Sequence, residues 1–277
     1  MRIFLAGGAG ALGRRIIPRL TALGHHVTAT TRHSERVDIL SRLGATPTIV
    51  DVYDADRLAA AVIAAAPDLI LHELTDLSRF DRDANARLRR EGTANLVAAA
   101  KNAGVTRIIV QSIAWVFPDG TTLATEEDAA VSGTAVDDME QLAWTVPHAT
   151  VLRYGMLYGP DTWYAPEGQI ARVVGKRGLP ATAAYTCFVH IDDAAAATVE
   201  ALAWPDGLYQ VVDDEPAPAT SWLPVYARAI GAPEPEITAA VPGTPLGRPV
   251  SNAKARAAGW EPIYPTWREG FHHLTDT

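Results

Sequence analysis

A glycine-rich segment close to the start of the chain constrains its fold most. Gly7, Gly10 and Gly13 follow a short apolar run that ends at Ala6, and they precede an apolar pattern of helical spacing. A strand, a glycine loop and a helix in this order place phosphate groups at a helix N-terminus, because glycine lets the backbone turn tightly and approach the phosphates. We therefore expect a bound dinucleotide, with a glycine turn serving packing alone as the alternative. The expected contacts are Gly7, Gly10, Ala11, Leu12 and Gly13.

The first 115 residues alternate between apolar runs of strand length and Ala- and Leu-rich stretches of helical length. This alternation predicts an α/β fold of Rossmann type, with a doubly wound, buried parallel sheet. The expected strands are residues 2–6, 26–31, 46–50, 68–74 and 107–112.

Residues at the ends of the helical stretches support this segmentation. Gly24, Gly44 and Gly104 stand where left-handed C-caps are needed, and Ser34 and Asp54 stand where N-caps are expected. A further helix is expected over residues 134–145 and a strand over 149–154. We expect a Rossmann domain over residues 1–160, with its core in 1–115. Residues 161–277 should form a smaller substrate-binding part, with 186–214 returning to the Rossmann sheet.

Composition narrows the class of protein. A formal net charge of -8 argues against binding of nucleic acid, which needs concentrated Lys and Arg. The single cysteine, Cys187, fits a reducing, cytoplasmic setting. The apolar run at the N-terminus is too short for a signal peptide or a membrane span, so we expect the chain to start directly with its fold and to have no membrane partner.

The residue after the second strand bears on the choice of cofactor. Sites that prefer NAD usually carry Asp or Glu there, whereas this chain has Arg32, whose permanent charge suits a 2′-phosphate. We therefore expect NADP, with NAD as the alternative and a solvated arginine as the plainer interpretation of Arg32. Asp51 is expected to receive the adenine amino group or to cap the helix near Asp54. Val52 and Leu74 are the remaining expected cofactor contacts.

Several motifs together resemble one family. The chain carries the glycine loop, the Asp51-Val52 pair, Ser112 after the fifth strand and a closing segment around Trp260, as well as residues 152–155, 157–160 and 188–193 in the same order. As a set they are similar to the extended short-chain dehydrogenases/reductases, the NAD-dependent epimerase/dehydratase group. The resemblance covers essentially the whole chain and implies the Rossmann fold, a nicotinamide cofactor and, through two helices, a homodimer.

The proton relay of that family is missing. Its members use a Tyr-x-x-x-Lys pair, yet this chain has no tyrosine between Tyr53 and Tyr154 and no lysine between Lys101 and Lys176. The resemblance is therefore to atypical members that keep the nucleotide fold and lose part of the catalytic set. Chemistry must then be argued from the site itself.

Candidates for chemistry lie at the carboxyl ends of the predicted strands. The resemblance places Ser112 beside a reactive substrate group, although a serine capping a strand end is equally common. Glu73, ranked ahead of His72, and Tyr154 are candidate proton donors. Expected substrate contacts are Asp76, Trp115, Trp163 and Tyr164, although such aromatic residues are more often plain core.

Other charged groups receive a structural interpretation. His190 with Asp192 and Asp193 could form a dyad, but an anchoring or helix-capping role is the preferred interpretation. The arginines of residues 79–90 fit a solvated face or a subunit contact, or else a site for an acidic substrate group. No His or Cys spacing fits a metal site, and no metal is expected.

Three functions fit these residues. The first is an NADP-dependent reductase of a small organic carbonyl, imine or activated alkene, with Ser112 and Tyr154 stabilising developing charge. The second is a redox-neutral lyase, isomerase or cyclase that uses Glu73 or Asp76. The third is a non-enzymatic NADP sensor, which the missing Tyr and Lys favour and the retained C-terminal segment disfavours.

Overall fold

The computed structural model describes residues 1–75 and 81–274, which belong to two compact units. Unit 1 comprises Met1–Ser112, Ser132–Leu152 and Thr198–Leu208, and unit 2 comprises Ile113–Val131, Arg153–Ala197 and Tyr209–Thr277. The chain thus passes between the units several times, because each unit is made of three separate segments. The sequence alone predicts one main boundary, at residue 160.

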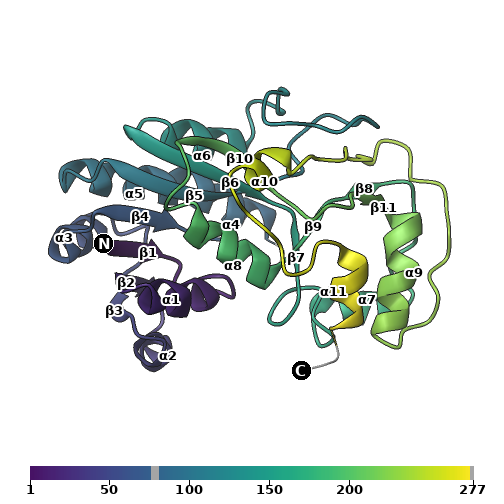
Figure 1. The fold of residues 1–277 in the computed structure, drawn as a ribbon, viewed down its shortest axis with the longest axis horizontal. Helices are drawn as coiled ribbons and strands as arrows, with labels where there is room; N and C mark the ends of the chain where they lie inside the picture. Colours follow the sequence, from purple (N-terminus) through teal and green to yellow (C-terminus); the bar gives the residue numbers. More distant parts are fainter. Residues whose placement is uncertain (76–80, 275–277) are drawn as a thin grey trace. The chain divides into compact units, whose positions relative to one another are not determined.

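A seven-stranded sheet confirms the predicted Rossmann architecture (Figure 1). The strand order is β10-β6-β5-β4-β1-β2-β3, so the chain starts in the middle, runs to one edge and then returns to the other side of β1. β1 pairs in parallel with both β2 and β4, and β4 pairs in parallel with β5. The carboxyl ends of β1 and β4 therefore form the switch point at which such sheets bind ligands. The strands are β1 Arg2–Ala6, β2 His26–Thr31, β3 Thr46–Ile49, β4 Leu69–His72, β5 Arg107–Ile113, β6 His148–Tyr154 and β10 Gly207–Val211.

The helices of unit 1 lie against this sheet (Figure 1). In one row α5 packs between α3 and α6, while α1 contacts β2 and α2 contacts β3. Every residue of β4 is buried, as expected for a strand covered on both faces. The helices are α1 Gly13–Ala22, η1 Ser34–Arg36, α2 Val37–Arg42, α3 Ala55–Ala65, α4 Arg82–Arg87, η2 Leu88–Gly92, α5 Thr93–Asn102 and α6 Ala135–Ala143.

Most of the predicted helix ends are correct. Gly24, Gly44 and Gly104 have φ values of 79°, 93° and 70°, the left-handed conformation that ends α1, α2 and α5. The Asp54 side chain accepts a hydrogen bond from the Arg57 N–H and caps α3.

One predicted cap is wrong. Ser34 is the first residue of η1, and His33 precedes it without a side-chain cap. The 3₁₀ turn before α2 thus replaces the expected cap by the serine.

Unit 2 contains short strands and helices around an aromatic core. β7 pairs with β9 in parallel and β8 pairs with β11 in antiparallel fashion. The core gathers Tyr164, Phe188, Trp222 and Tyr226, whose rings meet edge to face at centroid distances of 5.1–6.4 Å. The elements are β7 Met156–Tyr158, α7 Gln169–Gly175, β8 Tyr185–Thr186, β9 Phe188–His190, α8 Ile191–Glu200, β11 Ala217–Pro218, α9 Ala219–Ala229, α10 Ala253–Ala257 and α11 Trp267–His272.

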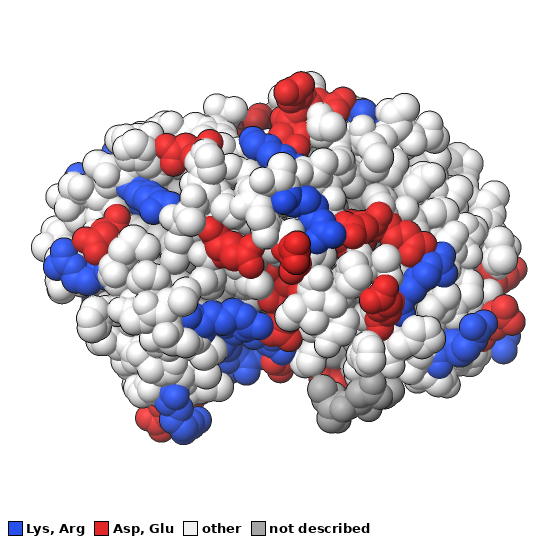
Figure 2. Space-filling view, in the orientation of Figure 1, with Lys and Arg blue, Asp and Glu red and all other residues white. Residues whose placement is uncertain are grey.

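Two further features concern possible partners. Among the helices of the described residues, none combines the length and the apolar character that crossing a membrane requires. On the face seen in Figure 2, basic and acidic side chains alternate in small groups, without a broad basic area.

Candidate cofactor site

The glycine loop packs so closely that side chains are excluded at several of its positions. A Cβ atom on Gly7, which has a φ of 94°, would lie 2.5 Å from the carbonyl oxygen of Glu73 at the end of β4. A Cβ on Gly13 would lie 2.6 Å from the Gly7 carbonyl oxygen. The loop is closed by a hydrogen bond from the Gly10 N–H to that same oxygen, 3.0 Å away. Glycine is therefore required by contact with β4 and within the loop itself.

A cavity of about 220 Å³ opens beside this loop, within unit 1. It lies at the carboxyl ends of β1, β2 and β4, the switch point of the sheet. Its wall combines loop backbone, apolar side chains and a basic edge. The lining residues are Ala6, Gly7, Ala9, Gly10, Thr30, Thr31, Arg32, His33, Arg36, Val50, Val52, Leu58, Glu73, Leu74, Thr75 and Leu88.

The apolar and basic parts of this wall suit different parts of a dinucleotide. Val50, Val52, Leu58 and Leu88 are each at most 6% exposed and form an apolar surface for a flat ring such as adenine. Arg32 and Arg36 follow β2 and supply positive charge. The glycine loop precedes α1, whose N-terminus attracts phosphate. A nicotinamide dinucleotide therefore fits the chemistry of the residues present.

Four of the expected cofactor contacts do not line this cavity. Leu12 is buried at the start of α1, and neither Ala11 nor Gly13 belongs to the lining. Asp51 is exposed, and its Oδ1 accepts a hydrogen bond from the Tyr53 N–H at 3.0 Å. Asp51 thus stabilises the turn after β3 instead of capping α3, and its contact with adenine stays a prediction.

Glu73 is the most unusual residue of the cavity. It lines the cavity, is 5% exposed, and neither of its carboxylate oxygens has a hydrogen-bond partner among the described residues. Burial raises the pKa of Glu73 well above its usual range. An ionised carboxylate in such surroundings is costly, so the neutral acid is the favoured form.

His72 has the opposite character. Its Nε2 pairs with Thr93 Oγ1 at 2.8 Å, and its Nδ1 accepts from the Leu74 N–H. The accepting role of Nδ1 makes Nε2 the protonated atom of the neutral ring. Burial lowers the pKa of His72 to about 4, so it stays neutral and orders the chain after β4.

Ser112 lies at the end of β5 as expected, but its hydroxyl is already engaged. It donates a hydrogen bond to Glu140 Oε1 of α6 at 2.5 Å, and both residues are buried. The serine can still accept a hydrogen bond, whereas donating to a substrate oxygen requires release of Glu140. The structure thus joins Ser112 to α6, the helix to which the resemblance assigns the missing Tyr-x-x-x-Lys pair. Glu140 therefore becomes a further candidate group.

Four of the remaining candidates, two tryptophans and two tyrosines, belong to unit 2. Trp115 is 51% exposed and Trp163 packs at the border of the aromatic core. Tyr154 and Tyr164 are buried. Tyr164 lies among three other aromatic rings, so packing in the core explains why an aromatic residue stands at this position. Asp76 lies outside the described residues. The substrate roles of all these residues stay predictions.

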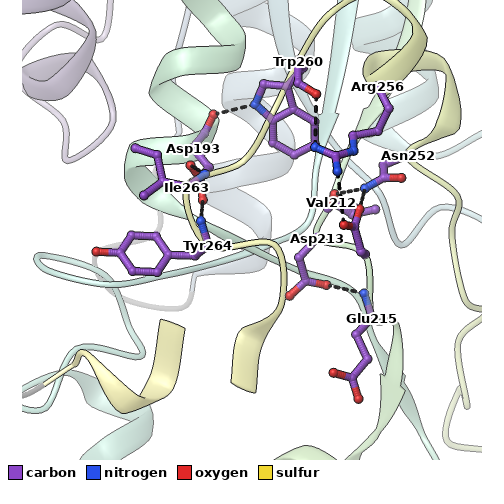
Figure 3. Close-up of polar contacts among 10 residues, drawn as sticks. Asp193, Val212, Asp213, Glu215, Asn252, Arg256, Trp260, Ile263 and Tyr264 are labelled. Carbon is purple, nitrogen blue, oxygen red and sulfur yellow. Dashed lines mark hydrogen bonds and ion pairs between the residues drawn. The ribbon is translucent and has the colours of Figure 1, made fainter. Parts of the chain in front are cut away.

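Asp193 anchors the C-terminal part of unit 2 (Figure 3). The buried carboxylate of Asp193 accepts hydrogen bonds from the N–H groups of Ile263 and Tyr264 at 2.7 and 3.0 Å. The Trp260 indole donates to the Asp193 carbonyl oxygen. Asp193 therefore holds the closing segment of the chain against α8, which agrees with a structural assignment.

Candidate metal ligands are scattered. In residues 1–75 and 81–274, no three His, Cys, Asp or Glu side chains gather closely enough to hold a metal ion.

The comparisons with known proteins agree with this site. A profile of the family described as NAD(P)H-binding matches residues 7–158. The chain belongs to this NAD(P)H-binding family. A 3-diazoavenalumate denitrifying reductase from a Streptomyces species is 40% identical over 98% of this chain and 99% of its own length.

Two further comparisons show the breadth of the group. A 2′-dehydrokanamycin reductase from Streptomyces kanamyceticus is 27% identical over 95% of this chain and 76% of its own length. The crystal structure of a UDP-glucose 4-epimerase from Thermus thermophilus with NAD superposes with a TM-score of 0.80, at 24% identity over 100% of this chain and 98% of that one. The fold that the resemblance to the NAD-dependent epimerase/dehydratase group implies is thereby confirmed. The family and the reductases among its relatives support an NAD(P)-binding oxidoreductase.

Several lining residues were not expected from the sequence. Thr30, Arg36, Leu58 and Leu88 line the cavity and belong to β2, η1, α3 and η2, respectively. Arg36 had a usable signal, because it is a second arginine four residues after Arg32. Leu58 and Leu88 had none, since a leucine in a helix looks the same whether it faces the core or a ligand.

Proposed function

We propose that this protein is a cytoplasmic, NADP-dependent reductase of a small aromatic or carbonyl-like molecule. The preference for NADP rests on Arg32 and Arg36, two arginines at the edge of one cavity with the glycine loop. A 2′-phosphate carries about two negative charges and is bound well by guanidinium groups. When bound, the reduced nicotinamide supplies a hydride. The homodimer implied by the resemblance is also part of this proposal, and light scattering of the purified protein tests it.

The chain's own residues bind and orient this cofactor. The glycine loop and the N-terminus of α1 bind phosphate, the apolar wall excludes water from a flat ring, and the arginines neutralise charge. Ser112, held by Glu140, is the proposed hydrogen-bonding group beside the substrate. Its hydroxyl accepts a hydrogen bond without moving, and it donates one only after release from Glu140.

The missing Tyr-x-x-x-Lys pair favours a substrate that needs no added proton. Reduction of a carbonyl or imine requires a hydride and a proton, and the proton is the task of the tyrosine. An arenediazonium ion differs, because it accepts a hydride and becomes an arene and N₂ without any further proton. The C–N bond breaks, a C–H bond forms, and charge is balanced. The 40% identical relative, named as a denitrifying reductase of a diazo compound, supports this substrate class as the first to test.

Carbonyl, imine and activated alkene substrates are the second class. They are supported by the relative named as a 2′-dehydrokanamycin reductase. They require a proton donor, for which Ser112 with Glu140, Tyr154 and Glu73 are the proposed sources.

The first experiment measures the cofactor. Purified protein is titrated with NADPH and NADH, together with the variants Arg32→Ala, Arg36→Ala and Gly10→Asp. We expect NADPH to bind more tightly, each arginine variant to reduce that advantage, and Gly10→Asp to abolish binding of both. Equal binding of both nucleotides by the parent protein rejects the NADP assignment.

The second experiment measures the reaction. A stabilised arenediazonium salt and a panel of ketones are incubated with NADPH deuterated at C4, and the arene or alcohol is analysed for deuterium. Because diazonium salts also react without enzyme, the Gly10→Asp protein is the matched control. Deuterated arene above this control supports the first class, and deuterated alcohol alone supports the second.

A further inference from the structure

The turn after β2, formed by residues 32–36 and here called the arginine turn, carries both arginines on which the proposed cofactor preference rests. Arg32 and Arg36 are four positions apart and both line the cofactor cavity. A phosphate binds two arginines most tightly when their backbones are already held in place, because ordering a loose segment on binding costs free energy. The group that fixes the arginine turn therefore bears on cofactor selection.

The side chain of Thr31, the last residue of β2, closes the arginine turn. Its Oγ1 accepts a hydrogen bond from the His33 N–H at 3.1 Å and donates one to the His33 carbonyl oxygen at 3.3 Å. The same carbonyl oxygen accepts the Arg36 N–H at 3.0 Å. One hydroxyl thus ties His33 to the end of β2, and His33 in turn ties the 3₁₀ turn that carries Arg36.

The backbone of Thr31 is itself fixed in the central sheet. Its carbonyl oxygen accepts the Val50 N–H at 3.0 Å, and the residue pairs with Ile49 of β3. Thr31 is 6% exposed and lines the same cavity as the two arginines. The arginine turn is therefore attached through Thr31 to the seven-stranded sheet.

Packing alone does not explain a threonine at this position. Valine has nearly the same shape and is buried in strands more often than threonine. What the hydroxyl of Thr31 adds is its pair of hydrogen bonds to His33, and its single proton is used in one of them. Donation to a cofactor would require that same proton, so the geometry favours a hydroxyl that holds the turn.

We propose that Thr31 is a positioning residue for cofactor selection, which holds the arginine turn so that Arg32 and Arg36 bind the 2′-phosphate of NADPH together. The inference rests on the NADP preference proposed above and extends it to a residue that does not itself contact the phosphate. The neighbouring Thr30 has a different task. Its Oγ1 accepts the Gly7 N–H at 3.1 Å and so supports the loop for the pyrophosphate that NADH and NADPH share.

Threonine-to-valine substitutions within β2 separate these tasks. In Thr31→Val we expect NADPH to bind about tenfold more weakly, the usual effect of one lost charge-assisted hydrogen bond, and NADH to bind within about twofold of the parent protein. Thr31→Ser keeps the hydroxyl and should keep the preference for NADPH. Thr30→Val should weaken both nucleotides by the same factor. Thr28→Val, at a half-buried position outside the lining of this cavity, should change neither affinity.

A double-mutant cycle distinguishes positioning from direct contact. In the Arg32→Ala/Arg36→Ala protein no guanidinium group remains for Thr31 to position, so we expect Thr31→Val to leave NADPH binding unchanged in that background. A further tenfold loss there, about as large as in the parent protein, would show that the hydroxyl itself binds the phosphate and would overturn the inference. NADH binds at the same glycine loop, so its retained affinity reports that each variant is folded.

The outcomes separate this inference from the proposed function. If the parent protein prefers NADPH and Thr31→Val keeps that preference, the role of Thr31 is rejected and the proposal of an NADP-dependent reductase stands. If Thr31→Val weakens NADH as strongly as NADPH, the hydroxyl supports the whole cavity and the inference is also rejected. If the parent protein binds both nucleotides equally, the NADP preference and the inference are rejected together.

Discussion

At the scale of single residues, Gly7 carries the greatest steric demand of the cofactor loop. A Cβ there would meet the Glu73 carbonyl oxygen at 2.5 Å while φ stays at 94°. We predict that Gly7→Ala lowers the free energy of unfolding by about 2 kcal/mol or more and abolishes NADH binding, because both strain and collision distort the loop. Chemical denaturation and a fluorescence titration measure the two effects.

Gly24 provides the matched control for this prediction. It has a φ of 79° but no atom within 4 Å of a Cβ, so Gly24→Ala adds strain without collision. We expect a loss of about 1 kcal/mol and unchanged NADH binding. Equal losses in the two variants would show that contact with β4 is unimportant.

The predicted cofactor residues that line the cavity share one property. Their position depends on residues next to them in the chain. A glycine loop directly after a strand is visible in the sequence, and Gly7, Gly10 and Arg32 all line the cavity. The roles of Asp51 and Ser112 were less predictable. Each side chain is engaged by a partner that sequence distance does not reveal, the Tyr53 N–H in a tight turn and the Glu140 carboxylate across 28 positions.

At the scale of elements, helix α8 and the closing segment of the chain depend on one carboxylate. We predict that Asp193→Ala lowers the free energy of unfolding by about 3 kcal/mol, because it leaves the Ile263 and Tyr264 N–H groups without their acceptor. Asp193→Asn keeps one acceptor oxygen and should cost about half as much. Denaturation curves measure the loss, and hydrogen exchange should accelerate at the amides of Ile263 and Tyr264.

The neighbouring Asp192 is the control, since it lies on the same turn but is 31% exposed at its side chain. Asp192→Asn should leave exchange at Ile263 and Tyr264 unchanged. Equal acceleration in both variants would instead indicate a general loosening of α8.

The predictability of elements differs between the two halves of the chain. The five expected strands of the first 115 residues all exist, because each has at least four residues and alternates with a stretch of helical length. In unit 2 the strands β7, β8, β9 and β11 have only two or three residues, so their apolar pattern has no measurable period. Residues 186–214 were expected to return to the Rossmann sheet. Within this range β10 belongs to that sheet, whereas β8 pairs with β11 and β9 pairs with β7.

At the scale of the whole molecule, two buried carboxyls shape the dependence of stability on pH. Burial raises the pKa of Glu73 and of Asp213 well above their ordinary values of 4.5 and 3.8. A raised folded-state pKa means that the folded protein holds a proton that the unfolded chain releases. Their stabilising contribution is therefore complete below about pH 4 and is lost as pH rises toward the folded-state pKa values.

We predict that the cofactor-free protein loses stability as the pH rises above 6, by at most about 1.4 kcal/mol per pH unit for each group. Glu73→Gln and Asp213→Asn should each reduce this slope, whereas Glu127→Gln should not. Denaturation at several pH values measures it, and unchanged slopes in both buried variants would contradict the prediction.

The distribution of charge over the whole molecule gives the last prediction. A net charge of -8 repels NADH and NADPH alike, and salt weakens this repulsion for both. The extra phosphate of NADPH instead meets the local positive charge of Arg32 and Arg36, which salt also weakens. The ratio of the two affinities removes most of the shared repulsion, so it reports the arginines. We expect the preference for NADPH to fall several-fold between 50 and 500 mM salt, and the Arg32→Ala/Arg36→Ala protein to show a ratio near one at every salt concentration. A preference that persists unchanged at 500 mM salt would point to recognition of the 2′-phosphate by uncharged donors, and Thr30 and Thr31 on the same wall would be the residues to substitute next.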